Sequence, residues 1–244
     1  MSEFEKSRWA DSAFSQGYRE DADYFLPLRR QCIEVVKSLY GHCILPKPSP
    51  EILDLGCGDG LFIQELSKAG KPAKITLVDG SAEMLAAARK RLAGLKDLHF
   101  FQASFQQLVA EDPLNGTFDF IYSSLAIHHL QRKEKEELYA YIHQHLSAGG
   151  WFVHYDVVLP PSAILENWYL TLWGEWIKTH TPEEKRAQLR HYPRQYKENP
   201  DNMPDALDSQ LEILKKIGFH HVDCFYKYGI FSLFGGCRGL PSCS

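Results

Sequence analysis

The chain has 244 residues, 44% of them hydrophobic, so it can bury a substantial core and general disorder describes it poorly. Its 27 lysines and arginines stand against 31 acidic residues, a formal net charge of −4 that argues against general nucleic-acid binding. Because no run approaches the roughly 20 apolar residues of a membrane helix and the first residues lack a signal-like apolar core, we expect a cytoplasmic protein that does not bind membranes.

Six cysteines are scattered along the chain, at positions 32, 43, 57, 224, 237 and 243. None forms a Cys-x-x-Cys pair, the arrangement typical of zinc and redox sites. In a reducing compartment this usage predicts buried thiols rather than a disulfide framework or a metal site.

Before residue 51 the sequence predicts one clear helix, from about Pro27 to Tyr40. Its apolar residues fall on one stripe at helical spacing: Leu28, Cys32, Val35, Val36 and Leu39. The preceding segment, Trp9 to Phe25, is aromatic and charged without clear periodicity, so the pattern assigns no element to it.

From Glu51 to Asp156 short β-branched runs alternate with amphipathic helical runs, which predicts a parallel sheet covered on both faces. The expected strands are Glu51 to Leu55, Lys74 to Asp79, Leu98 to Gln102, Phe118 to Ser123 and Gly150 to Val158. The expected helices are Leu61 to Ala69, Ser81 to Ala93 and Arg132 to Leu146, each followed by a glycine able to end it.

After the fifth strand, Pro160-Pro161 breaks the chain and Ser162 is expected to cap a helix that runs to about Lys178. Thr181-Pro182-Glu183-Glu184 predicts a second short helix, with the threonine as its cap. The remaining elements are expected to be a loop from His191 to Pro204, a helix from Ala206 to Ile217, and strands His221 to Lys227 and Ile230 to Phe234.

A glycine-rich segment follows the first strand and opens a helix: Asp54-Leu55-Gly56-Cys57-Gly58-Asp59-Gly60. Glycines suit a sharp turn whose backbone lies directly against a ligand. The next strand ends at Asp79, whose carboxylate is placed to accept both hydroxyls of a ribose lying across the strand ends. A nicotinamide or flavin fold is disfavoured, because Leu61 stands where its fingerprint has a third glycine.

These residues, with the segments around them, resemble the class I S-adenosylmethionine-dependent methyltransferases from Glu51 to about Asp156. The resemblance implies that S-adenosylmethionine is the cofactor and S-adenosylhomocysteine its product. It implies that Asp54, Gly56, Cys57 and Gly58 hold the amino-acid end, that Asp79 and Gly80 hold the ribose, and that Met84 lies against the adenine. Packing inside the second helix is an equally good reading of Met84.

Other cofactor contacts implied by the resemblance are Ser104 and Phe105 after the third strand, Ser123 and Leu125 beside the sulfonium, and Tyr18 in the N-terminal segment. Where many members place an aspartate against the adenine amino group, we expect the Ser104 hydroxyl to accept that hydrogen bond, more weakly. An arginine of the N-terminal segment, Arg19, Arg29 or Arg30, is a candidate partner for the cofactor carboxylate, with a surface ion pair as the alternative.

Candidate bases lie at two strand ends. His128 and His129 follow the fourth strand, and His154 and Asp156, on one face by alternation, end the fifth. We take His128, His154 and Asp156 as the catalytic candidates; a capping or packing role for the histidine pair, and a buried hydrogen-bond network around His154, are the alternatives.

An aromatic stripe marks the helix after the fifth strand: Leu165, Trp168, Tyr169, Leu172, Trp173, Trp176 and Ile177. Packing onto the domain accounts for much of it, and a substrate lid or a dimer face is the functional alternative. If the stripe is a lid, truncating Trp173 and Trp176 should raise the acceptor KM and spare cofactor binding.

The resemblance implies a single α/β domain with a Rossmann-like, seven-stranded, mostly parallel sheet, helices on both faces and a helical insertion after the fifth strand. We divide it into an N-terminal helical lid (1–50), a cofactor-binding core (51–158), the insertion (160–204) and a C-terminal helix with two strands (205–244).

The expected activity is methyl transfer to a small-molecule acceptor, because no nucleic-acid domain is appended and the motifs of DNA amino-methylating and pyrimidine-C5 enzymes are missing after the fourth strand. A monomer and a homodimer are both compatible with the pattern. Three alternatives stay open: an enzyme resembling carboxy-S-adenosylmethionine synthase, which alters the cofactor itself on a transfer RNA modification route; a non-catalytic cofactor-binding protein; and a nicotinamide oxidoreductase.

Overall fold

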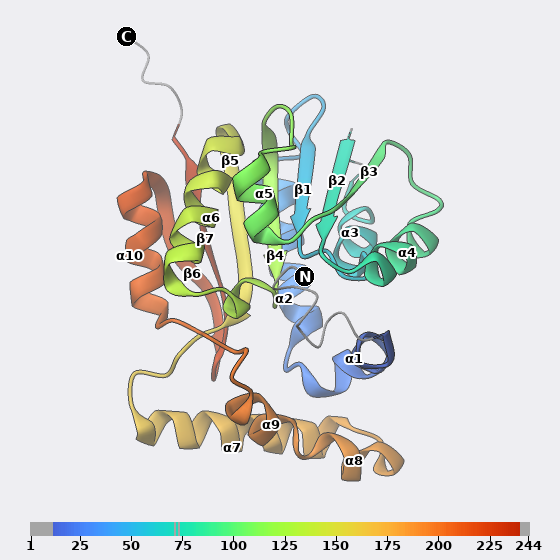
Figure 1. Ribbon diagram of the computed structural model, residues 1–244, viewed down its shortest axis with the longest axis vertical. Helices are drawn as coiled ribbons and strands as arrows, with labels where there is room; N and C mark the ends of the chain where they lie inside the picture. Colours follow the sequence, from blue (N-terminus) through green and yellow to red (C-terminus); the bar gives the residue numbers. More distant parts are fainter. Residues whose placement is uncertain (1–11, 71, 73, 240–244) are drawn as a thin grey trace.

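The computed structural model describes residues 12–239 except 71 and 73, and in it seven strands form one sheet in the order β3-β2-β1-β4-β5-β7-β6 (Figure 1). The first five strands along the chain are parallel, and β7 runs antiparallel to both of its neighbours. The strands are β1 (Glu51–Leu55), β2 (Lys74–Asp79), β3 (Leu98–Gln102), β4 (Phe118–Ser124), β5 (Leu146–Val157), β6 (Phe219–Tyr228) and β7 (Phe231–Arg238). The predicted sheet is confirmed in strand number and class.

Helices cover both faces of the sheet, and a separate buried cluster lies under each set. One face carries α2 (Arg29–Cys43), α3 (Leu61–Leu66) and α4 (Ala82–Arg91); the other carries α5 (Phe105–Glu111), α6 (Arg132–His145) and α10 (Leu207–Ile217). Alternation along β4 shows the division, since Phe120 and Tyr122 pack in the first cluster while Ile121 packs in the second. Each strand thus presents alternate residues to two different cores.

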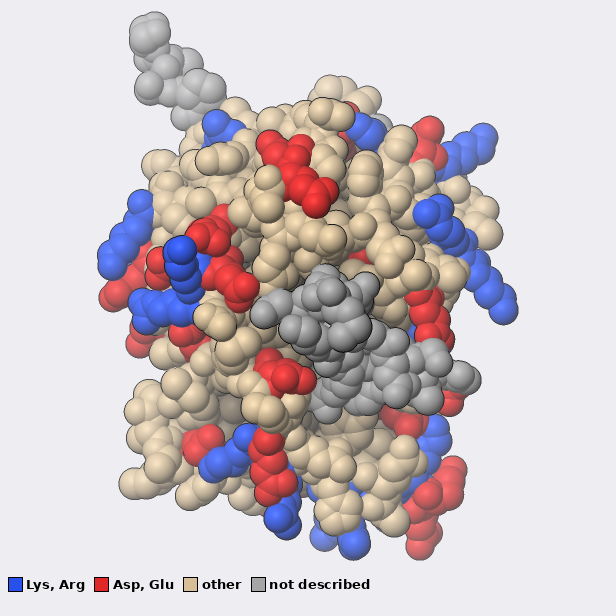
Figure 2. Space-filling view, in the orientation of Figure 1, with Lys and Arg blue, Asp and Glu red and all other residues tan. Residues whose placement is uncertain are grey.

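A third group of helices lies beyond the carboxyl ends of the strands: α7 (Ala163–His180), α8 (Glu183–Leu189) and α9 (Tyr192–Glu198), with α1 (Ser12–Phe25) beside them (Figure 1). We call these four helices the cap. Phe25 stacks on Tyr192 at 4.1 Å between ring centroids, and Lys185 pairs with Asp21. On the face shown in Figure 2, acidic and basic side chains are interspersed over the core and the cap alike.

Trp173 joins α7 to α1. Its side chain is buried, and its indole N–H donates to the carbonyl oxygen of Phe25 at 2.6 Å. Among the described residues neither Trp173 nor Trp176 lines the cavity introduced below, so the lid prediction for these two side chains is wrong and packing of the cap is their role.

Trp173→Phe is expected to lower the free energy of unfolding by about 1–2 kcal/mol, because the buried Phe25 carbonyl loses its donor while most of the packed volume is kept. Urea unfolding followed by circular dichroism measures the change. Trp168→Phe, at a side chain 56% exposed, is the matched control and should change stability by less than about 0.5 kcal/mol. Equal stabilities of the two variants would contradict the proposed role of the Trp173–Phe25 hydrogen bond in holding α7 to α1.

Most helices agree with the sequence prediction; the exceptions are α5, which the pattern did not assign, and parts of the cap. The hydroxyls of Ser81 and Ser162 accept backbone hydrogen bonds at the N-termini of α4 and α7, as predicted for Ser162. The aromatic segment before Pro27 forms α1, which the pattern did not assign, and the loop expected from His191 to Pro204 contains α9. The prediction that Thr181 is the N-terminal capping residue of α8 is also wrong, because Thr181 is buried and α8 begins after Pro182.

Within the described part of the chain, no helix combines the length and apolar character needed to cross a membrane.

Candidate functional site

A cavity of about 500 Å³ opens at the carboxyl ends of β1, β2 and β4, between the sheet and α1 of the cap. Nine of the expected cofactor residues line it. They are Asp54, Gly56, Cys57 and Gly58 from the first turn, Asp79, Gly80 and Met84 from the second, and Ser104 and Phe105 from the third. The structure therefore brings these residues to one site, as expected for strand ends that meet at one edge of a parallel sheet.

The first turn follows β1 as a tight backbone loop. Gly56, Gly58 and Gly60 have φ angles of +68°, +53° and +76°, a region of backbone conformation that favours glycine. A Cβ on Gly56 would lie 2.6 Å from the Cβ of Ala126, whereas a Cβ on Gly58 would meet nothing within 4 Å. The loop thus packs tightly against the chain after β4 on one side and leaves open space on the other.

Asp79 holds this loop to the second turn. One carboxylate oxygen accepts from the Gly58 N–H at 2.8 Å and the other accepts from the Ser81 N–H at 2.8 Å. Burial raises the pKa of Asp79, although these two hydrogen bonds act in the opposite direction. Each carboxylate oxygen can accept more than one hydrogen bond, so the group can still bind hydroxyls of a ligand.

Asp54 is a buried acid without a full set of partners. Its side chain is 2% exposed, lines the cavity, and has one oxygen that accepts no hydrogen bond from any residue the structure describes. Burial, followed by the charges of Asp79 and Asp59, raises the pKa of Asp54 well above its ordinary value. A cationic group placed in the cavity would relieve both the desolvation and the repulsion.

Ser104 begins α5 with a reciprocal cap. Its hydroxyl accepts from the Gln107 N–H at 3.2 Å, and its own N–H donates to the Gln107 side chain at 2.9 Å. The expected hydrogen bond to an adenine therefore has to share an oxygen that already caps a helix. Met84 and Phe105 also line the cavity. Met84 is buried in α4, so its packing role is confirmed, while its contact with the adenine stays a prediction.

Ser123 does not line the cavity, and its expected position beside the sulfonium is wrong. It is fully buried and donates its hydroxyl proton to the Leu55 carbonyl at 2.8 Å, because alternation along β4 turns it to the face opposite Tyr122. Leu125 does line the cavity, and Ser124 lines it in place of Ser123. Leu125 has a φ of +52°, a conformation that costs a non-glycine residue energy and is held by its N–H bond to Tyr155.

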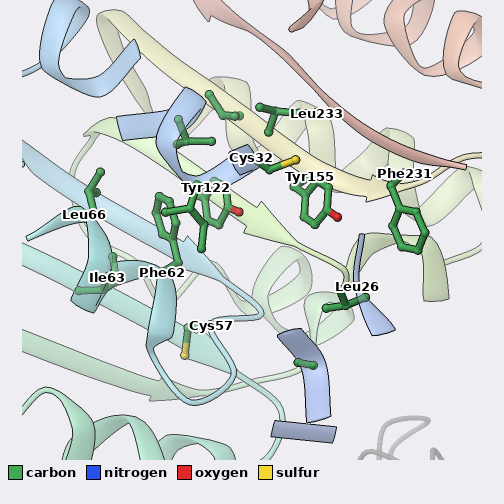
Figure 3. Packing of buried hydrophobic residues seen from close by; sticks show 14 of the residues in the cluster. Leu26, Cys32, Cys57, Phe62, Ile63, Leu66, Tyr122, Tyr155, Phe231 and Leu233 are labelled. Carbon is green, nitrogen blue, oxygen red and sulfur yellow. The ribbon is translucent and has the colours of Figure 1, made fainter. Parts of the chain in front are cut away.

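His128, His154 and Asp156, the three catalytic candidates, also lie outside the cavity lining. They form one buried cluster that contacts Tyr139 of α6, which in turn donates to Gln210 of α10. Tyr155, which lies between two of them in sequence, lines the cavity and packs among the residues of the other core (Figure 3). His154 and Asp156 do share one face as predicted, but that face is the core. The buried network is thus the correct interpretation of this group.

Asp156 is the centre of that cluster and accepts four hydrogen bonds. The donors are the His128 N–H (2.9 Å), His128 Nδ1 (2.5 Å), His154 Nε2 (2.8 Å) and the Val157 N–H (2.9 Å). Burial alone would raise the pKa of Asp156, but the charges and hydrogen bonds of His128 and His154 outweigh it and hold the pKa well below its ordinary value. The hydrogen-bond network continues at Tyr139, whose hydroxyl lies 3.3 Å from His154 Nδ1 and donates to the Gln210 side chain at 2.7 Å.

The residue next to His128 does reach the cavity. His129 is half-buried and lines it, and its Nδ1 lies 3.0 Å from the carbonyl oxygen of Asp201. Asp201 and Met203, which follow α9, line the cavity too. Sequence reasoning missed both, because the segment was expected to be a loop of the insertion and carries no ligand motif.

The N-terminal segment supplies positive charge to the opposite wall. Arg19, Arg29 and Arg30 line the cavity as expected. Arg29 and Arg30 also pair with Asp23, at 3.3 and 2.5 Å, and Arg30 pairs with Glu65 at 3.2 Å. Tyr18 lies within α1, but its side chain is outside the described part of the structure, so its expected cofactor contact stays a prediction.

Comparison with known proteins identifies the fold and its class. A family model described as a methyltransferase domain matches residues 52–150. Among solved structures, an O-methyltransferase family protein from Burkholderia thailandensis superposes with a TM-score of 0.68 at 15% identity, over 98% of this chain and 64% of that one. A structure described as the DhpI-SAM-HEP complex gives 0.60 at 18% identity, over 96% and 95%. Residues 52–150 therefore match a methyltransferase domain, and the whole chain has the fold of these two structures.

A relative named carboxy-S-adenosyl-L-methionine synthase, from Methylococcus capsulatus, is 29% identical to this chain over 187 residues, which cover 74% of each chain. The match extends well beyond the 99 residues of the family model, so it includes more than the glycine loop and its neighbours.

The residues present fit S-adenosylmethionine as the cofactor. The unsatisfied, buried carboxylate of Asp54 suits a cationic amino group, and Asp79 stands where β2 ends. The open space beside Gly58 admits a ligand against the backbone. The nicotinamide alternative is set aside, because Leu61 is the first residue of α3 and the fingerprint's third glycine is missing. In the described ranges no group of three potential ligands is placed to bind a metal ion.

Proposed function

We propose that this protein transfers the methyl group of S-adenosylmethionine to a small-molecule acceptor bound in the same cavity. The observation that carries the proposal is the composition of that cavity, which joins the glycine loop and Asp79 to a second region lined by Tyr122, Tyr155 and His129. Tyr122 stacks on Phe62 at 3.5 Å between centroids, on the side of the sheet that faces α2 and α3 (Figure 3). Aromatic side chains of this kind suit a small organic molecule.

The cofactor supplies a methyl group already activated on a positively charged sulfur. The protein's own contribution is then to hold the acceptor in line with that methyl group and to exclude water. Leu125 and Ala126 lie at the junction of the two regions, since Ala126 abuts Gly56. α1 and the segment after α9 also line the cavity, so both can help to exclude water from it.

A second candidate is supported by the relative named above. In carboxy-S-adenosyl-L-methionine synthase the cofactor itself gains a carboxyl group, as that name states, and this chain matches the relative over most of its length. The arginines of α1 and α2, Arg19 and Arg29, line the cavity and suit a carboxylate, whether it belongs to an acceptor or to a modified cofactor.

Native mass spectrometry of the purified protein separates these candidates. Under the methyl-transfer proposal the copurifying ligand has the mass of S-adenosylmethionine or S-adenosylhomocysteine, and incubation with labelled cofactor and a panel of phenols, catechols, primary amines and carboxylic acids yields a labelled product. A ligand heavier by one carboxyl group supports the second candidate. Cofactor binding with no product and no modified ligand would contradict both and leave a binding protein.

Asp79→Ala is expected to weaken S-adenosylmethionine binding by about 1.5–3 kcal/mol, a Kd roughly 10- to 150-fold higher, because charge-assisted hydrogen bonds to the ribose and the brace on Gly58 are lost together. Titration calorimetry with S-adenosylmethionine and S-adenosylhomocysteine measures it. Asp208→Ala, at an exposed residue of α10 outside the cavity lining, is the control and should bind as the wild type does. Equal affinities for wild type and Asp79→Ala would overturn the ribose assignment.

A further inference from the structure

The side chain of Arg29, the first residue of α2, lines the cavity and is 20% exposed. Within the residues that the structure describes it makes one ion pair, from Nη1 to Asp23 Oδ1 at 3.3 Å. A guanidinium carries five N–H donors in a planar fork, so this pair leaves most of the donors without an acceptor in that part of the chain. Largely desolvated cations in proteins are normally paired, and this arrangement therefore points to an anion that enters the cavity.

The other two arginines of this wall have different surroundings. Arg30 donates through Nε and Nη2 to Asp23 Oδ2 and through Nη1 to Glu65 at 3.2 Å, so two carboxylates engage its fork. Arg19 lies 4.0 Å from Glu83 in the first turn of α4, on the side of the cavity formed by the second turn of the cofactor region. The arginine at the start of α2 thus combines open donors with a place away from that turn.

The chain between α1 and α2 lies against the second region of the cavity. The Tyr155 hydroxyl donates to the Pro27 carbonyl at 3.4 Å. Burial raises the pKa of Tyr122, whereas a hydrogen bond from Ser124 and the charge of Arg29 oppose that rise, so the guanidinium is near enough to act on this phenol. Both tyrosines line the cavity. Arg29 therefore adds a positive charge to the region where the aromatic side chains gather.

The beginning of α2 strengthens this charge and holds it in place. In the described structure the helix has no acidic residue in its first turn and no side-chain hydrogen bond at its N-cap, Leu28. The dipole of a 15-residue helix adds a partial positive charge at this end. The end of α1 just before it is fixed by the bond from the Trp173 indole to the Phe25 carbonyl and by the stacking of Phe25 on Tyr192. The positive group is thus carried by a well-anchored part of the cap.

A carboxylate fits this guanidinium better than a phosphate does. It accepts two parallel N–H bonds from the planar fork and brings one negative charge. A phosphate monoester brings about 1.5 to 2 negative charges at neutral pH, into a cavity that is also lined by the buried acids Asp54 and Asp79. One guanidinium with open donors therefore favours a monoanion.

We propose that the methyl acceptor is a small carboxylic acid, with its carboxylate bound by Arg29 and its organic part against Tyr122 and Tyr155. The inference rests on the proposed methyl-transfer function and names its substrate class. Carboxylate oxygens held in a guanidinium fork are poor nucleophiles, so a hydroxyl or amino group elsewhere in the molecule takes the methyl group. That oxygen or nitrogen bonds to the methyl carbon as the carbon–sulfur bond breaks, sulfur keeps the electron pair, and the proton of the attacking atom passes to solvent water.

The test uses matched acids and amides as probes: 4-hydroxybenzoate with 4-hydroxybenzamide, 4-hydroxyphenylacetate with its amide, and 4-aminobenzoate with its amide. Titration calorimetry measures their binding to the complex of the protein with S-adenosylhomocysteine. We expect the wild type to bind at least one acid about 10- to 100-fold more tightly than its amide, because the charge-assisted bonds to Arg29 are lost with the amide.

Arg29→Gln should bind that acid no more tightly than the amide and keep an S-adenosylhomocysteine Kd within about twofold of wild type, since Arg30 still pairs with Asp23. Arg29→Lys keeps the charge without the planar fork, so its acid preference should be intermediate. Arg194→Gln, at an exposed residue of α9 outside the cavity lining, is the matched control and should behave as the wild type. With labelled S-adenosylmethionine, Arg29→Gln should lose the acid preference mainly through KM, a selective change that lower stability alone would not cause.

Three results would overturn the inference alone: acids that bind no more tightly than their amides, an acid preference that survives Arg29→Gln, and tighter binding of 4-hydroxyphenyl phosphate than of any carboxylate. An S-adenosylhomocysteine Kd at least tenfold higher in Arg29→Gln would also overturn it, because the arginine would then hold the carboxylate of the cofactor. If acids bind through Arg29 but neither they nor any other molecule of the panel yields a labelled product, the methyl-transfer function fails while the carboxylate site stands.

Discussion

Asp156→Asn is expected to lower the free energy of unfolding by about 3–5 kcal/mol, although the residue lies outside the cavity. Asp156 is 1% exposed, and each of its two oxygens accepts two hydrogen bonds. Asparagine offers one accepting oxygen and turns an NH2 group toward two donors, so buried N–H groups lose their partners. Urea unfolding at neutral pH, followed by circular dichroism, measures the change.

The stability difference between wild type and Asp156→Asn should also depend on pH. The pKa of Asp156 is lowered on folding, so its contribution is fully present above the ordinary value of 3.8 and is lost as the pH falls below that value toward the folded one. Unfolding free energies measured from pH 7 to pH 3 should therefore differ by a constant amount down to about pH 4 and converge below it. Asp208→Asn, exposed on α10, should track the wild type at every pH. The role given to Asp156 would be contradicted if the wild type and Asp156→Asn differed in unfolding free energy by less than about 1 kcal/mol at neutral pH. It would also be contradicted if that difference did not decrease in acid.

The cofactor region could be predicted from the sequence because its signals are local. Each strand of the parallel half is a short apolar run, each turn that lines the cavity follows a strand directly, and parallel strands bring those turns to one edge. Gly56, Gly58 and Asp79 needed no knowledge of distant contacts to be placed. Ser162 likewise caps α7 through a hydrogen bond to a residue three positions away.

The acceptor region could not be predicted in the same way, because its residues meet only through tertiary contacts. Asp201 and Met203 reach the cavity through bonds to His129, His128 and Lys135, which lie 68 or more positions away in sequence. The resemblance placed Ser123 beside the sulfonium, but alternation along β4 turns that side chain away from the cavity, and Ser124 lines it instead. Of His128 and His129, which both follow β4, His129 lines the cavity and His128 does not, and no pattern in the sequence separates the two.

Gly235→Ala is expected to cost about 3 kcal/mol or more of stability, because β7 passes too close to β5 for any side chain at this position. A Cβ on Gly235 would lie 2.0 Å from the Phe152 carbonyl oxygen and 3.1 Å from the Val153 Cα, and both are backbone atoms that cannot rotate away. The clash falls within the β5 and β7 ladder, where Gly235 pairs with Val153. Moving β7 would disturb the end of β5 that carries Tyr155 to the cavity and Asp156 to the core.

Gly174→Ala is the matched control for this change, since a Cβ there meets nothing within 4 Å and the residue lies inside α7. Alanine should stabilise that helix by about 0.5–1 kcal/mol, so the same substitution is expected to act in opposite directions at the two glycines. Thermal and urea unfolding of both variants measures the contrast. If the Gly235→Ala protein were as stable as the wild type, β7 could move away from β5 without cost. The close pairing of these two strands would then not be what holds Tyr155 and Asp156 on opposite faces of the sheet.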